Sequence, residues 1–436
     1  MATAQLSGTM GLPFAGEILQ ISSNPYEYGK RRHQQYGLVS RTRWLSKKAI
    51  IMLGADAQRF VLMTNQRNFV TSRGYSLIEP FYGGTLLLSD GEQHAHEKRL
   101  MMPAFHSRNM GAYLEIMNRV IDVHLNKWGQ SGQRGLYPDI AAITFNLATS
   151  LMLDIEVPEK QEEFVKIWTT FASGGNSILR VDAPLSAYGR ALAAGRKINV
   201  ILQNIIDEQR QNSQSSLLKR LLDERDEDGQ PLSDATLIKQ LRLLVFAGFD
   251  TTTGSLSWIF TEMLRSPALL ERVRAEVKAD QADAPLQIED ITNTPYLDAL
   301  IDESTRMYPQ AMLMLRGIIE DVEYEGLLLP KGWTVVLMPA YTHRMPEYFK
   351  DPNTFDPERF LPDRNEAKKY PGAWIGFGAG AHACIGEGVA RTEIKALLTR
   401  LLRRFDIQAV PGQDFRQLFL PLSRPKSDVV VNYQAR

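Results

Sequence analysis

The only cysteine of the chain, Cys384, lies in a glycine-rich stretch that constrains the fold more than any other feature. This stretch runs from Phe377 to Gly386, and its glycines permit tight turns and close backbone approach. Apolar residues after Gly386 recur every three to four positions, which predicts a helix. Cys384 is therefore expected where a loop meets a helix N-terminus, whose N–H groups and dipole favour a thiolate. Such a thiolate suits a nucleophile, a redox thiol or an iron ligand; a small buried hydrophobe is the alternative.

The residues around Cys384 follow the pattern Phe-x-x-Gly-x-(Arg/His)-x-Cys-x-Gly. This pattern resembles the haem-ligand signature of the cytochrome P-450 family, with Phe377 at its first position and His382 at its basic position. The resemblance implies that the Cys384 thiolate binds the iron of haem b and favours O–O cleavage. It also assigns Phe377 to the haem site and His382 to a haem propionate.

The length alone would suggest two or three domains, but the sequence favours one large folded unit. The 436 residues carry no net formal charge and are 44% apolar, so they can bury a large core. No linker, repeat or low-complexity run divides them, and a single domain is expected over residues 1–436. One cysteine excludes internal disulfides and multi-cysteine zinc sites. The neutral charge argues against a nucleic-acid partner.

The N-terminal segment from Met1 to Gln20 lacks the pattern of a signal peptide. It also lacks an apolar run long enough to cross a bilayer, so no transmembrane anchor is expected. Among members of the family, this favours a soluble, bacterial-type protein in the cytoplasm.

Two basic residues, His94 and Lys98, are four positions apart and share a helix face, so both can address one anionic group. A solvated basic face is the alternative. Their spacing resembles that of the family helix that contacts the haem propionates. Lys98 replaces the commoner arginine and gives up bidentate pairing. Arg99 could then supply part of the charge. The same resemblance assigns Arg316 to the second propionate-binding position.

A long apolar helix is predicted from Ser233, its N-cap, to about Arg265, with Pro267 beyond its end. It contains Ala247-Gly248-Phe249-Asp250-Thr251-Thr252. Core packing explains the small residues but leaves a buried aspartate in need of a partner. The segment resembles the family motif where the distal helix bulges above the iron. The resemblance implies that Thr251 hydrogen-bonds the activated oxygen or its water, and that Asp250 relays protons.

A carboxylate and a guanidinium, Glu303 and Arg306, are three positions apart on a predicted helix. Such pairs usually lie on the surface and matter little. The family resemblance adds Arg359, in Asp356-Pro357-Glu358-Arg359-Phe360, as their partner. It implies a buried structural cluster of Glu303, Arg306 and Arg359 beneath the haem.

Several segments are expected to shape the substrate pocket by resemblance to the family. They are residues 70–89, the stretch from Met307 to Met314, residues 418–422, and a mobile lid over 172–190. The candidate pocket residues are Arg73, Tyr75, Phe81, Ala247, Met312, Leu313 and Leu420. A substrate carboxylate could pair with Arg73 or Arg180, although ordinary surface arginines are the alternative.

Other elements follow from periodicity. We expect a short helix over Asn24 to Tyr36, a hairpin of Thr42–Trp44 and Ala49–Leu53, and a helical pattern from Met110 to Ser173. The expected fold is mainly α-helical with small β-sheets. In the cytochrome P-450 fold that this resembles, haem lies between the long distal helix and the Cys-loop helix.

The resemblance predicts a monooxygenase that hydroxylates an apolar small molecule of the retinoid, terpenoid or sterol type. Two electrons would come from NAD(P)H through a ferredoxin- or flavodoxin-type donor and its reductase, with no fused reductase expected. Basic residues of the last helix would steer the acidic donor: Arg391, Lys395, Arg400, Arg403 and Arg404.

Four alternatives are weaker. A fatty-acid hydroxylase of the same family differs only in substrate. A peroxygenase typically lacks the acid–threonine pair that Asp250 and Thr251 retain. A non-catalytic haem-binding protein has no need for that pair. A cysteine-nucleophile hydrolase could use Cys384 but leaves Glu303 and the arginines unexplained.

Overall fold

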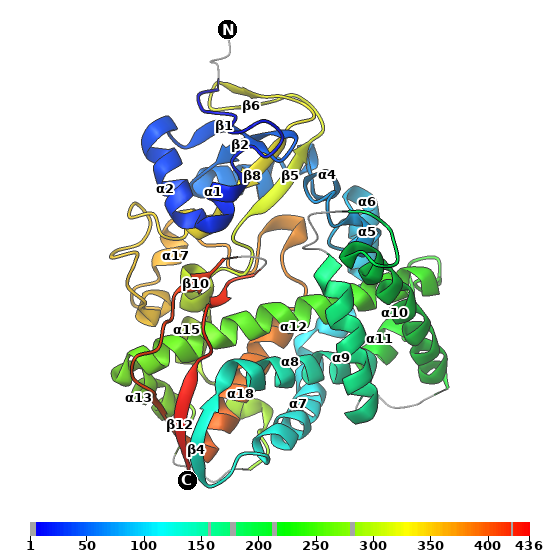
Figure 1. Cartoon of the computed structure of the whole chain (residues 1–436), viewed down its shortest axis with the longest axis vertical. Coiled ribbons are helices and arrows are strands. Elements are labelled where there is room, and N and C mark those ends of the chain that lie inside the picture. The colour runs from blue at the N-terminus through cyan, green and yellow to red at the C-terminus, as the bar shows by residue number, and fades with distance from the viewer. Residues whose placement is uncertain (1–5, 156–157, 175–179, 212–215, 280–283, 420–421) are drawn as a thin grey trace.

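We describe the protein from a computed structural model, over residues 6–155, 158–174, 180–211, 216–279, 284–419 and 422–436. One helix, α12 (Asp234–Arg265), crosses the molecule and organises its helical part (Figure 1). The Ser233 hydroxyl caps it by accepting a hydrogen bond from the Thr236 N–H, and Pro267 begins the next helix. The predicted bounds of the long helix are therefore confirmed.

Other long helices pack around α12. Helix α8 (Leu136–Leu153) packs along it, and α10 (Ala187–Arg210), α15 (Pro295–Met307) and α18 (Glu387–Arg404) also contact it. Helices α7 (Met110–Leu125) and α9 (Pro158–Ser173) complete the layer around them. The shorter helices are α1 (Ile18–Ser23), α2 (Pro25–Tyr36), α3 (Ala55–Arg59), α4 (Thr71–Gly74), α5 (Glu79–Tyr82), α6 (Gly91–Met101), α11 (Leu217–Asp223), α13 (Pro267–Glu276), α14 (Ile288–Thr292), α16 (Pro339–Thr342) and α17 (Glu366–Lys369).

A five-stranded sheet lies at the N-terminal end of the molecule (Figure 1). Its order is β1 (Val39–Trp44), β2 (Lys47–Met52), β8 (Thr334–Leu337), β5 (Met314–Ile318) and β3 (Phe69–Val70). Strands β2 and β8 are parallel, and the other neighbours are antiparallel. The predicted hairpin is confirmed, with Lys47 and Lys48 inside β2 and not in the turn.

Three smaller sheets complete the strands. They are β4 (Ser131–Gly135), β12 (Val430–Ala435) and β9 (Phe405–Ala409); β10 (Gln417–Leu418) with β11 (Arg424–Pro425); and β6 (Val322–Tyr324) with β7 (Leu327–Leu329). The mainly helical fold with small sheets is as predicted.

The helical pattern predicted from Met110 to Ser173 is wrong in one part. Strand β4 interrupts it between α7 and α8 and pairs with β12 near the C-terminus. The hydrogen-bond partners of β4 lie about three hundred residues away in sequence, so local periodicity could not reveal it.

Among the described helices, α8 is the one with the length and apolar composition of a membrane span. Two observations explain its character. Of its residues, 67% are buried inside the protein, and the helix packs along α12. Its apolar residues therefore fill the core.

A buried ionic cluster ties α15 to the loop between α16 and α17. The Glu303 carboxylate accepts hydrogen bonds from Arg306 Nε at 2.6 Å and from Arg359 Nε at 3.2 Å. Arg359 also contacts Glu366 at 2.7 Å, and Arg364 contacts Glu366 at 2.6 Å. Remaining Arg306 N–H groups donate to the carbonyls of His343, Pro352 and Thr354. Every charge in the cluster thus has an opposite charge and neutral partners.

Replacing one member of this cluster should destabilise the fold. We expect Glu303→Gln to lower the free energy of unfolding by about 3–5 kcal/mol, because two buried guanidinium groups lose their shared carboxylate. Urea unfolding followed by far-UV circular dichroism measures the loss. The control is Glu358→Gln, an exposed carboxylate of the same loop. Equal stability of the two variants would show that the cluster contributes nothing specific.

Candidate active site

The loop that carries Cys384 is held by its own backbone. The Cys384 N–H donates to the Phe377 carbonyl at 2.8 Å, and α18 begins three residues later at Glu387. Gly380 has a φ of 67° and lies against the neighbouring chain, so that a Cβ there would be 1.8 Å from the Leu62 oxygen. Only glycine fits this close approach. The predicted loop-to-helix position of Cys384 is therefore confirmed.

The Cys384 thiol is accessible and yet enclosed. Its side chain is exposed, but burial by the surrounding protein raises its pKa. The backbone N–H groups of Gly386 and Glu387 lower this pKa, although they do not outweigh burial. The expected effect of the backbone N–H groups on the thiolate is therefore present, but desolvation of the charge is larger and the net pKa is raised. A cation such as iron would stabilise a thiolate in this position.

The middle of α12 is likewise both accessible and enclosed by protein. Ala247 is exposed and Asp250 partly accessible, whereas Val245 and Thr252 on either side are buried. Burial nevertheless raises the pKa of the Asp250 carboxyl to about 6. Both stretches are thus enclosed by protein and still accessible, as expected for the walls of an internal cavity.

The hydroxyl of Thr251 is turned onto its own helix. It donates to the Ala247 carbonyl at 2.5 Å, and the Ser255 hydroxyl donates to the Thr251 carbonyl at 3.0 Å. The helix remains α-helical from Asp234 to Arg265, so the expected bulge is not present as a break. These bonds to carbonyls four residues earlier satisfy the hydroxyls of Thr251 and Ser255, and the backbone hydrogen bonds of α12 stay regular.

Four cationic or imidazole side chains predicted for the propionates come close together. The rings of His94 and His382 lie 3.9 Å apart between centroids, and Lys98 Nζ donates to the Ala381 carbonyl at 2.5 Å. Arg316 on β5 is 4% exposed, and its Nη1 donates to the Leu315 carbonyl at 2.9 Å. Within the described ranges Arg316 has no ion pair. A buried guanidinium with this set of partners fits an anionic ligand.

Burial determines which of these four side chains are charged. It lowers the pKa of His94, and it lowers the pKa of His382 to about 3, with the Arg316 charge adding to the effect. Both imidazoles are therefore neutral near pH 7, and each offers one N–H. Burial also lowers the pKa of Arg316, which still remains protonated. Arg316 and Lys98 thus supply the positive charge.

The predicted pocket residues lie at different depths. The Tyr75 hydroxyl donates to the Leu313 carbonyl at 3.3 Å and accepts from the Leu315 N–H of β5 at 3.3 Å. Phe81 is 1% exposed and packs against the rings of Phe171 and Tyr188. Met312 is buried and Leu313 partly accessible. Leu420 lies outside the described residues, as does part of the expected lid.

The two arginines considered for a substrate carboxylate are both exposed. Arg180 donates to the Leu77 carbonyl, and Arg73 lines a groove at the surface. Neither lies in the enclosed region around Cys384.

Sequence reasoning missed two residues that support the site. The Asp90 carboxylate accepts hydrogen bonds from the N–H groups of Thr71 and Ser72 and lies 3.7 Å from His382 Nε2. The Thr71 hydroxyl lies 3.3 Å from the same nitrogen. Asp90 directly precedes α6, where an aspartate is a common cap, and this signal could have drawn attention to it.

The basic residues of α18 do not form the exposed patch expected for an electron donor. Lys395, Arg400 and Arg403 are buried and pair with Asp298, Asp122 and Asp290. Arg391 contacts Asp298, Asp302 and Glu387, and Arg404 contacts Asp122. These pairs fasten α18 to α7, α14 and α15.

Taken together, these residues fit haem. Cys384 is suited to bind the iron, and His94, Lys98, Arg316 and His382 to bind the propionates. Asp250 and Thr251 line the α12 side. Bound haem would supply oxygen activation, and the protein supplies the ligand, the anion site and an acid with a raised pKa.

The chain is similar to known proteins along nearly its whole length. The family model "Cytochrome P450" matches residues 6–432. "Putative cytochrome P450 120" of Synechocystis is 33% identical over 97% of this chain and 95% of its own length. "Abscisic acid 8'-hydroxylase 4" of Arabidopsis thaliana is 28% identical, over 98% of this chain and 92% of its own.

A solved structure is also similar. "Retinoic acid bound cyanobacterial CYP120A1" superimposes with a TM-score of 0.88 and 31% identity, and each chain is covered completely. The fold and the match along nearly the whole chain agree. The chain therefore belongs to the cytochrome P-450 family of haem-thiolate monooxygenases, which hydroxylate apolar small molecules.

Proposed function

We propose that the protein hydroxylates a retinoid or a related terpenoid, and that its natural substrate is a carboxylic acid of this class. The observation that carries the proposal is the similarity over the whole chain to a retinoic acid-bound structure. Abscisic acid, named in another relative, is also an isoprenoid carboxylic acid. A sterol or a long-chain fatty acid is the alternative substrate.

The residues have distinct roles in this proposal. Cys384 binds the iron of haem b, and the propionates are held by Arg316, Lys98, His94 and His382. Asp250 holds a proton in the enclosed region and can give it up near neutral pH, because burial raises its pKa to about 6. Thr251 can exchange its bond to the Ala247 carbonyl for one to a nearby water or substrate oxygen.

A cluster of aromatic rings packs against α12. Tyr82 packs against Phe246 of α12 at 5.0 Å and Phe171 of α9 at 5.8 Å between ring centroids. Rings packed in this way would exclude water from this side of the proposed haem site. They also give an apolar substrate a matching surface.

Electrons are proposed to come from NAD(P)H through a ferredoxin- or flavodoxin-type donor and its reductase. Family membership supports this route. The basic residues of α18 give this route no further support, because carboxylates neutralise their charges. We also propose a cytoplasmic location, which the single free cysteine favours.

The iron ligand can be tested by spectroscopy. We expect the dithionite-reduced protein under carbon monoxide to show a strongly red-shifted Soret band, because a thiolate donates electron density to the iron. Cys384→Ala should lose this band even when reconstituted with haem. A wild-type protein that is loaded with haem and gives only the unshifted band would contradict ligation by Cys384.

Proton supply by Asp250 predicts a pH dependence. With a pKa of about 6, the carboxyl is protonated at lower pH and loses its proton as the pH rises through this value. If its proton limits turnover, the rate of product formation should fall across this range. Asp250→Asn should remove the dependence and lower the rate about 100-fold. Glu208→Gln, an exposed carboxylate on α10, is the control and should behave like the wild type.

Substrate class can be tested by optical titration. Retinoic acid should shift the Soret band of the resting protein at lower concentration than palmitic acid or cholesterol. Product analysis with a reconstituted electron donor should then find a hydroxylated retinoid. Tighter binding and turnover of palmitic acid would favour the fatty-acid alternative.

A further inference from the structure

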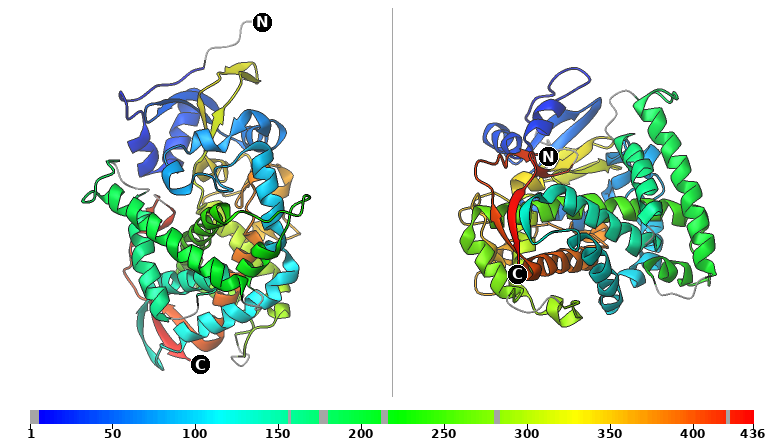
Figure 2. Two further views of the ribbon diagram at one scale, coloured as in Figure 1. Left: turned by 90° about the vertical axis from the view of Figure 1, so that its right-hand side faces the viewer. Right: turned by 60° about the horizontal axis from the view of Figure 1, so that its bottom comes forward.

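Arg391 of α18 lies where three parts of the molecule meet beside Cys384. Helix α18, orange in Figure 2, packs against both α12 and α15. It begins at Glu387, three residues after Cys384, and Arg391 follows one turn later. The Arg391 side chain is only 18% exposed. A guanidinium this enclosed depends on its protein partners and not on water.

Three carboxylates surround the Arg391 guanidinium. Its Nε donates to Glu387 at 2.9 Å, within the same helix. Its Nη2 donates to Asp302 at 2.5 Å, and its Nη1 lies 3.4 Å from Asp298; both carboxylates are on α15. Asp298 is also paired with Lys395, at 2.8 Å. Among the described residues, Arg391 is therefore the one cation paired with Glu387 and with Asp302.

The same guanidinium lies on the ring of Phe377. Its central carbon is 4.8 Å from the ring centroid, which is a cation–π contact. Phe377 is the first residue of the cysteine loop, and its carbonyl accepts the Cys384 N–H at 2.8 Å. Arg391 thus holds the side chain of a residue whose backbone holds Cys384, and it ties that residue to α15.

The charge near Cys384 depends on this arrangement. Burial is the main reason that the pKa of the Cys384 thiol is raised; the Glu387 carboxylate adds to the rise, whereas the Lys98 ammonium opposes it. Arg391 places a positive charge 2.9 Å from the Glu387 carboxylate and so offsets its effect on a thiolate. Without the guanidinium, a carboxylate with no cation beside it would lie three residues from the proposed iron ligand.

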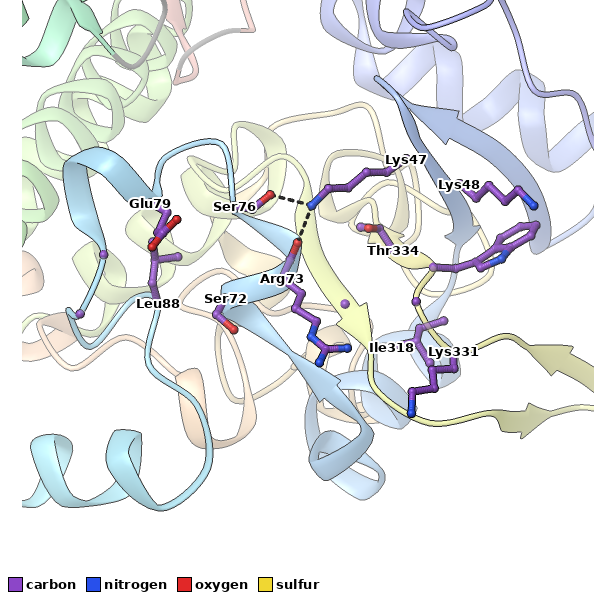
Figure 3. A pocket seen from close by; sticks show the side chains of 15 residues that line it. Lys47, Lys48, Ser72, Arg73, Ser76, Glu79, Leu88, Ile318, Lys331 and Thr334 are labelled. Atoms are coloured by element: carbon purple, nitrogen blue, oxygen red, sulfur yellow. Dashed lines mark hydrogen bonds between the residues drawn. The ribbon is translucent and has the colours of Figure 1, made fainter. Parts of the chain in front are cut away.

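A cation in a surface groove shows the contrast, because its partners are neutral. Lys47 and Arg73 both line this groove (Figure 3). There Lys47 Nζ donates to the Ser76 hydroxyl at 2.6 Å and to the Arg73 carbonyl at 3.1 Å, as the dashed lines show. Such contacts orient a cation but cancel no negative charge. Arg391 differs because its polar partners are anions, and one of them acts on Cys384.

We propose that Arg391 is a positioning residue for the Cys384 thiolate. It neutralises the Glu387 carboxylate beside the thiolate and supports the Phe377 ring of the same loop. In this way it sets how much electron density the thiolate donates to bound iron. The inference rests on the proposed ligation of iron by Cys384, and it holds for any substrate.

The test measures the reduction potential of the haem-loaded protein without substrate. Arg391→Gln should lower the equilibrium constant for reduction about ten-fold, or about 59 mV for one electron, because the unpaired Glu387 carboxylate opposes an added electron. Glu387→Gln should raise this constant, because a negative charge near the thiolate is lost. The double variant Arg391→Gln/Glu387→Gln removes both charges and should return close to the wild-type potential, which a merely structural role would not produce.

Two further variants control the comparison. Arg391→Lys keeps the positive charge and should keep most of the wild-type potential. Arg404→Gln removes a cation from the other end of α18, where Asp122 is its partner, and should leave the potential unchanged. The carbon monoxide spectrum verifies thiolate ligation in each variant. In Arg391→Gln the red-shifted band should convert to the unshifted band faster than in the wild type, because Phe377 loses a contact.

The proposal is overturned if Arg391→Gln keeps the wild-type potential, or if the double variant does not recover it. Glu387→Gln leaves Arg391 paired with α15, so it carries the test if Arg391→Gln takes up no haem, and an unchanged potential there would also overturn the proposal. These results would leave ligation by Cys384 standing, because the wild type would still give the red-shifted band. A haem-loaded wild type without that band would refute ligation itself, and the role of Arg391 with it.

Discussion

Compensation of buried charge is the constraint on which this structure depends. Around Glu303 the compensation is complete: one carboxylate serves two arginines, Glu366 serves one of them again, and backbone carbonyls accept the other N–H groups. Such a cluster has no capacity for a ligand, and its contribution is to fix α15 against the loop that leads toward Cys384. Arg316 differs because it donates to a backbone carbonyl and forms no ion pair among the described residues, although the more distant Asp90 carboxylate acts on its charge. The same side-chain chemistry is therefore structural in one place and suited to a ligand in the other.

The Cys384 thiol and the Asp250 carboxyl, on opposite sides of the proposed haem site, are also governed by the cost of a buried charge. Burial raises the pKa of both Cys384 and Asp250, because each would carry a negative charge in a poorly solvated region. For Cys384 an iron cation would reverse this preference. For Asp250 the raised pKa is itself useful, because an acid with a pKa of about 6 can both hold and release a proton.

The sequence predicted the parts that depend on local chemistry. Ser233 and Pro267 defined α12 because a cap and a helix breaker act within one turn. Cys384 could be placed because the glycines and the following apolar repeat are contiguous. Strand β4 was missed because its partner is β12, and the regular α12 was mistaken for a bulged helix because back-bonding of Thr251 is compatible with both. The role of Glu366 also depended on tertiary contact.

Distribution of charge, and not its amount, decides which cations are structural. The five basic residues of α18 occur close together in sequence and suggested a docking surface, but carboxylates from α7, α14 and α15 neutralise them. For Arg391, one partner, Glu387, is a single helical turn away, but Asp302 and Asp298 come from α15, 89 and 93 residues earlier. Because such pairs form only on folding, a run of positive charge in the sequence does not show whether it is a binding surface or a set of structural ion pairs.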